Sequence, residues 1–76
     1  MAAQAELRIE VSDPGVIQSL SSFLEHTIYR PGPPAGRIVS VTGPEGLSVL
    51  IARAELNLYL EAWRRFHPEV SASLID

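Results

Sequence analysis

The 76-residue chain contains no cysteine and no lysine. Without cysteine it can form no disulfide, no thiolate metal site and no Cys nucleophile, and we expect a cytoplasmic protein. All six basic residues are arginines, and nine acidic residues outnumber them, so the formal net charge is −3. Because non-specific nucleic-acid binding needs surplus cations to neutralise phosphates, we expect no nucleic-acid partner.

Long hydrophobic runs are missing as well. The longest apolar stretch, residues 47–52, falls far short of the roughly 18 residues that cross a bilayer. The first six residues have neither the basic start nor the apolar centre of a signal peptide. We therefore expect no membrane partner. An apolar content of 46% excludes a disordered chain.

The first third of the chain predicts a strand followed by a helix. Apolar and polar residues alternate from Leu7 to Ser12, which is typical of a half-buried strand. Asp13 then suits a helix N-cap, and Pro14 suits the first helical position, where no backbone N–H is needed. Apolar residues at helical spacing continue as far as Ile28. Residues 1–5, before the strand, are expected to fray.

The rest of the chain predicts a hairpin, a second helix and a last strand. Residues 29–36 (YRPGPPAG) should form an exposed Pro/Gly loop. Strands at residues 38–42 and 47–52, joined by the turn at 43–46, would make the hairpin. The period becomes helical from about Ala54 and ends at Pro68. Residues 70–75 alternate weakly, which favours a short strand over a frayed helical end.

Together these elements predict one α+β domain over residues 1–76. The order β-α-β-β-α-β, with four antiparallel strands and both helices on one face, is that of the ferredoxin-like plait. In this plait the reverse face of the sheet is uncovered. The second and fourth strands form its edges.

Catalytic and metal-binding patterns are absent. His26 and His67 are the only histidines, and neither has a neighbouring ligand at metal spacing. Ser22 lies four residues before His26, within reach of the imidazole, but no third group would orient that ring. We therefore expect no metal, no cofactor and no enzymatic activity.

The uncovered sheet face predicts an interaction surface. Leu50, together with Ile38 and Ile75, would place aliphatic groups on it, and an apolar surface of that kind typically contacts another protein. The predicted edge strands contain no proline or lysine to prevent pairing. These features favour a homo-oligomer, with a monomer carrying scattered exposed aliphatics as the alternative. Arg64 and Arg65 would hold an anionic partner or form a solvated surface.

The stretch from Leu7 to Ile17 resembles the start of an ACT-type regulatory domain. In that family the first strand runs into a D-x-P-G-type turn and an amphipathic helix. The resemblance implies a small molecule, usually an amino acid, held at a dimer interface near the turn. The matching positions are Asp13, Pro14, Gly15 and Val16, and the implied ligand-binding residues are Asp13, Gly15 and Val16.

Three functions therefore remain as hypotheses. The first is a non-enzymatic protein-protein interaction or regulatory module that self-associates through the open sheet face or the edge strands. The second is an ACT-like sensor of a small metabolite. The third is a non-catalytic subunit, or a small inhibitor, that acts on a larger protein.

Overall fold

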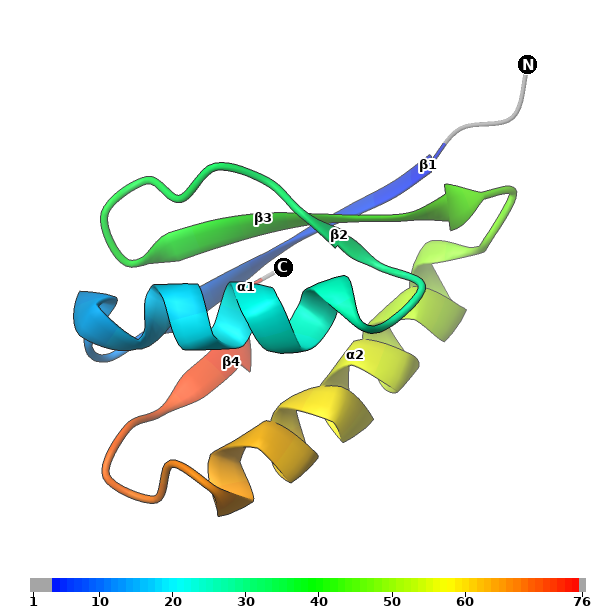
Figure 1. Cartoon of the computed structure of the whole chain (residues 1–76). Coiled ribbons are helices and arrows are strands. Elements are labelled where there is room, and N and C mark those ends of the chain that lie inside the picture. The colour runs from blue at the N-terminus through cyan, green and yellow to red at the C-terminus, as the bar shows by residue number, and fades with distance from the viewer. Residues whose placement is uncertain (1–3, 76) are drawn as a thin grey trace.

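A four-stranded antiparallel sheet carries both helices on one face (Figure 1). The computed structural model describes residues 4–75. The strand order across the sheet is β2-β3-β1-β4, which confirms the predicted plait. Along the chain the elements are β1 (Gln4–Val11), the 3₁₀ turn η1 (Pro14–Val16), α1 (Ile17–Glu25), β2 (Arg30–Pro31), β3 (Ile38–Glu45), α2 (Val49–Arg65) and β4 (Ala72–Leu74).

Alternating burial along β1 explains why the helices cover only one face. Ala5, Leu7, Ile9 and Val11 are buried, and the residues between them are exposed. Side chains on one face of a strand recur every second residue, so the four buried residues all point toward the helices. They meet the apolar sides of the two helices in one core, to which α1 contributes Ile17, Leu20 and Leu24 and α2 contributes Ala52, Leu56, Leu60 and Trp63.

The predicted start of the first helix is confirmed. The Asp13 side chain accepts a hydrogen bond from the Gly15 backbone N–H at 2.9 Å, and Pro14 follows the cap. The first turn is 3₁₀, and α1 then runs to Glu25. Ile28 was predicted on the apolar side of this helix, but it lies beyond the helix end and is 56% exposed.

The predicted strand at residues 47–52 is wrong. β3 is one strand over Ile38–Glu45, and α2 already begins at Val49. The Ser48 side chain caps α2 by accepting from the Ile51 N–H at 3.2 Å. Gly46, with φ at +86°, turns the chain between the two elements through a conformation that glycine adopts without steric penalty. The Ser48 cap and the helical spacing of Ala52 and Leu56 favour a helix here. They outweigh the alternation of Leu47, Val49 and Ile51, which favours a strand.

The hairpin is instead formed by β2 and β3, and β2 lies inside the segment that was predicted as an exposed loop. Arg30 pairs with Thr42 and Pro31 pairs with Val41. Pro31 is tolerated because β2 is an edge strand, where a missing N–H breaks no ladder. Tyr29, just before β2, is only 1% exposed, so the loop prediction holds only for the residues after β2.

The two ends of the chain differ in how well they were predicted. Gln4 and Ala5 belong to β1, and Ala5 is buried, so the prediction that they fray is wrong. Residues 1–3 lie outside the described part of the chain. At the other end β4 pairs antiparallel with β1, Val11 opposite Ala72, which confirms the short last strand.

Candidate interaction surface

The Asp13–Val16 turn, where the ACT-type resemblance implies a ligand, is occupied by its own contacts. The Asp13 carboxylate bonds the Gly15 N–H, and a Cβ at Gly15 would lie 3.2 Å from Asp13 Oδ1. Val16 is half-buried against the core. The start of α1 therefore explains these residues locally, and ligand binding at the turn stays a prediction. A shallow hollow of about 230 Å³ nearby includes none of them; it is lined by Glu10, Val11, Ser12, Arg37, Ser71 and Ser73.

The open sheet face is more polar than predicted. Ile38 lies on it opposite Glu10, and Ile75, whose N–H bonds the Arg8 carbonyl, lies at its edge. Leu50 is not on the sheet at all, because it belongs to the first turn of α2. The prediction of a half-apolar sheet face is therefore wrong. By register, the polar residues on this face are Glu6, Arg8, Glu10, Arg30, Ser40, Thr42 and Ser73.

Both sheet edges are protected, contrary to prediction. The edge strand β2 has only two residues, one of them proline. At the other edge, Ser71 O and Ile75 N bond β1, so alternation along the strand directs Ala72 O outward. Arg64 Nη1 donates to that carbonyl at 2.8 Å. The Arg64 side chain thus binds the β4 edge, whereas the sequence suggested that it would hold an anionic partner. An edge that is covered in this way resists pairing with another strand.

Most of the large apolar residues that are exposed in the described part of the chain lie on α2. Its core side is formed by residues 52, 56, 60 and 63, and five apolar residues at intervals of four wind around the rest of its surface, from the first turn to the C-cap Phe66. We call Leu50, Ala54, Leu58, Ala62 and Phe66 the outer row. Leu50 and Phe66 are each 81% exposed and Leu58 is 65% exposed. Each step of four residues turns about 40° around the helix, so Leu58 points to solvent while Leu50 and Phe66 lie on either side of it. The outer row is therefore a set of exposed apolar side chains spread over the surface of α2.

Both ends of the outer row are held in place by the fold. Ser48 caps the helix directly before it, and Ile51, 56% exposed, lies beside the row in the first turn. At the far end the Phe66 N–H bonds the Trp63 carbonyl. The imidazole of His67 stacks on the Trp63 indole at 4.2 Å between ring centroids. Arg65 is exposed in the last turn of α2, and its side chain makes no hydrogen bond or ion pair with another described residue.

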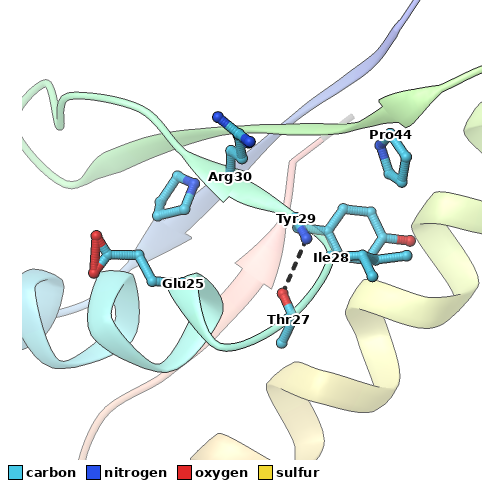
Figure 2. A pocket seen from close by; sticks show the side chains of 7 residues that line it. Glu25, Thr27, Ile28, Tyr29, Arg30 and Pro44 are labelled. Carbon is cyan, nitrogen blue, oxygen red and sulfur yellow. Dashed lines mark hydrogen bonds between the residues drawn. The ribbon is translucent and has the colours of Figure 1, made fainter.

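A second feature is an open hollow of about 700 Å³ between the end of α1, β2 and β3 (Figure 2). Glu25 and Arg30 are the charged residues that line it, and Ile28 and Pro44 are apolar lining residues. Thr27 and Tyr29 shape the turn between α1 and β2, because the Tyr29 N–H donates to Thr27 Oγ1 at 3.1 Å. Among residues 4–75, no buried polar side chain without a partner belongs to this hollow, so it points to no particular ligand.

Tyr29 itself connects this hollow to α2. Its ring is buried and its hydroxyl donates to a carboxylate oxygen of Glu55. Burial is the main reason that the pKa of the Tyr29 phenol lies well above its ordinary value of 10.0. The hydrogen bond to Glu55, and then the negative charge of Glu55, raise this pKa further. The glycine at position 43 leaves room for the ring, since a Cβ there would lie 3.3 Å from Tyr29 Cε1.

Alkaline pH should destabilise the protein through Tyr29. Above about pH 10 the unfolded chain releases the phenolic proton while the folded chain keeps it, so stability falls by about 1.4 kcal/mol per pH unit. Below that pH the group contributes no slope. Lysine and cysteine are absent, so neither adds a side-chain titration in this range. Urea unfolding between about pH 8 and about pH 11 should show a flatter decline for Tyr29→Phe; equal slopes would contradict this assignment.

A serine-histidine contact occurs where the sequence did not suggest one. His26 Nδ1 bonds the Ser22 backbone carbonyl at 2.7 Å, not the hydroxyl. Across 48 positions, Ser19 Oγ lies 3.3 Å from His67 Nε2, and His67 Nδ1 bonds the Trp63 carbonyl at 3.1 Å. Neither Ser19 nor His67 lines either of the two hollows that this section describes.

Comparison with known proteins does not assign the chain to a family. No family model, no curated protein and no solved structure matches the chain. Within the described residues, no helix is long and apolar enough to cross a bilayer. The same residues contain no group of three His, Cys, Asp or Glu side chains that could hold a metal ion. Among the surfaces described above, the exposed apolar residues of α2 are the strongest candidate for an interaction surface.

Proposed function

We propose that this protein is a non-enzymatic interaction module that associates with a second copy of itself through the outer row of α2. The observation that carries the proposal is the number of large apolar side chains that α2 and its C-cap expose, among them Leu50, Leu58 and Phe66. The sequence suggested the open sheet face and the edge strands as interaction surfaces. The open face is mostly polar and both edges are protected, so these surfaces are no longer supported.

Burial of the outer row would supply a modest association energy. Each fully buried large aliphatic or aromatic side chain contributes about 1.5–3 kcal/mol. Ordering two molecules opposes this by about 4–15 kcal/mol. The helix is about 25 Å long, and such a contact lies at the small end of stable interfaces. We therefore expect a dimer with a dissociation constant on the order of micromolar.

A dilution series tests this proposal. Size-exclusion chromatography with light scattering, at loading concentrations from about 1 µM to about 500 µM, should show the mass rise from one chain to two. The same protein at high salt should keep its dimer, because apolar contacts are not screened. A single-chain mass throughout the series would refute the proposal.

The cellular setting and any further partner belong to the same proposal. The absence of cysteine suits a cytoplasmic location, and a regulatory role would follow if the dimer presented its sheet face to another protein. The ACT-like sensor is the second candidate, supported by the Asp13-Pro14-Gly15 turn alone. A thermal upshift with an amino acid, lost in Gly15→Val, would favour that candidate.

A further inference from the structure

We infer that Ser19 is a nucleophilic serine that takes an acyl group from an activated ester, with His67 as its general base. The inference adds a covalent modification site to the proposed module and does not depend on self-association. Three features of the contact between these residues carry it: the protonation of the imidazole, the way its ring is held, and the exposure of the hydroxyl.

The hydrogen bonds of His67 fix which ring nitrogen carries the proton. Nδ1 lies 3.1 Å from the Trp63 carbonyl oxygen. A carbonyl oxygen only accepts hydrogen bonds, so in the neutral imidazole Nδ1 carries the hydrogen and donates it. Nε2 is then the bare nitrogen, and it lies 3.3 Å from Ser19 Oγ. The serine hydroxyl therefore donates to the nitrogen that can take its proton, at the loose separation that is common before a substrate binds.

The imidazole of His67 is held in this orientation by its surroundings. It stacks on the buried Trp63 indole, with 4.2 Å between ring centroids and 16° between ring planes. The backbone N–H of His67 also donates to the Arg64 carbonyl at 3.1 Å. An activated nucleophile requires a third group that orients its base. The carbonyl and the indole of Trp63 supply that group here.

This contact distinguishes Ser19 from the other serines. Ser22 lies on the same helix and is exposed as well, but only its backbone carbonyl bonds an imidazole, that of His26. The hydroxyls of Ser12 and Ser48 accept from backbone N–H groups. Among the described residues, Ser19 has the only hydroxyl that bonds a histidine ring, and its exposure lets an acyl donor reach it.

The expected reaction is a single acyl transfer. Ser19 Oγ attacks the carbonyl carbon of the ester, and the hydroxyl proton moves to His67 Nε2. The tetrahedral intermediate then expels the alcohol oxygen, which takes that proton and leaves as the free alcohol. The acyl group stays on Ser19 as a new ester. Transfer of one acyl group needs no turnover, so the site is compatible with a non-enzymatic protein.

Acetylation by p-nitrophenyl acetate, followed by tandem mass spectrometry of the peptides, tests this inference. In the folded protein Ser19 should be acetylated at least about tenfold faster than Ser22, because a positioned base contributes at least that factor. In urea the two serines should react at equal rates, since unfolding separates Ser19 from a histidine 48 positions away. This comparison uses the wild-type chain and depends on no variant.

Two histidine variants identify the base. His67→Gln removes the base but keeps a polar side chain, and it should lower acetylation of Ser19 to the rate of Ser22. His26→Gln is the matched control and should leave the rate at Ser19 unchanged. Equal rates at the two serines of the folded wild type would overturn the inference. A preference for Ser19 that survives His67→Gln, with circular dichroism unchanged, would overturn it too. Because the pair lies within one chain, a protein that never dimerises would remove the proposed function and leave this result standing.

Discussion

Replacement of Leu58 with glutamate should raise the dissociation constant of the dimer by at least about 100-fold, equivalent to about 2.7 kcal/mol. Leu58 is 65% exposed and lies on the solvent side of α2, so an apolar contact through this surface would bury a carboxylate from each copy. Charges buried without partners are strongly unfavourable. The side chain takes no part in the core, so the monomer should fold as before.

The matched control for Leu58→Glu is Ile75→Glu. Ile75 is 38% exposed and lies at the open sheet face, the surface that the sequence suggested for association. Sedimentation equilibrium of both variants, with circular dichroism to confirm folding, should find Leu58→Glu monomeric and Ile75→Glu unchanged. The reverse result would return the interface to the sheet.

Truncation of Tyr29 to alanine should lower the free energy of unfolding by about 3–5 kcal/mol. A domain of this size has a total of about 4–11 kcal/mol, so the variant should lose a large part of its stability and unfold at a much lower urea concentration. The ring is buried between the sheet and α2, and it makes an edge contact with Tyr59 at 6.0 Å between centroids. Its loss would leave a cavity and deprive Glu55 of its hydrogen-bond donor.

Two further variants distinguish the ring from its hydroxyl. Tyr29→Phe keeps the ring and should lose only about 1–2 kcal/mol in urea unfolding. Gly43→Val should be strongly destabilising in the wild-type chain, because its side chain meets the Tyr29 ring at close range. In the Tyr29→Ala background that penalty should shrink. Additive effects of the two changes would mean that the ring does not fill the space at Gly43.

The plait could be predicted because local patterns agree with it. Alternation from Leu7 to Val11 gave the first strand its buried face, and Asp13 with Pro14 marked the helix start. The apolar spacing of Leu56, Leu60 and Trp63 gave the second helix its core side. Each of these signals is a property of a short segment, so the sequence alone is enough to identify it.

The hairpin was misplaced for reasons that are not local. Residues 47–52 alternate like a strand, and only the Ser48 cap together with burial of Ala52 against the sheet makes them helical. Likewise Arg30–Pro31 pairs with β3 because Tyr29, just before it, is anchored in the core. A proline is equally compatible with an edge strand and with a loop, and a tertiary contact decides which of the two forms.

The candidate surface was hidden by the same error. Leu50 was recognised as an exposed aliphatic residue, but assignment to a strand separated it from Leu58 and Phe66. Once α2 starts at Val49, Leu50 and Leu58 belong to the same helix, and Phe66 is its C-cap. Arg64 was identified as a residue that could hold an anionic partner, but its side chain bonds the Ala72 carbonyl. That contact depends on where β4 lies, which no local pattern around Arg64 indicates.

Amide NMR spectra of nitrogen-15-labelled protein, recorded at about 20 µM and at about 1 mM, test the self-association through α2 most directly. Concentration should shift the resonances of Ile51, Leu58 and Ala62, on the solvent side of α2, while those of β1 stay in place. Shifts confined to β4 or to the open sheet face, or no shift anywhere, would contradict the account.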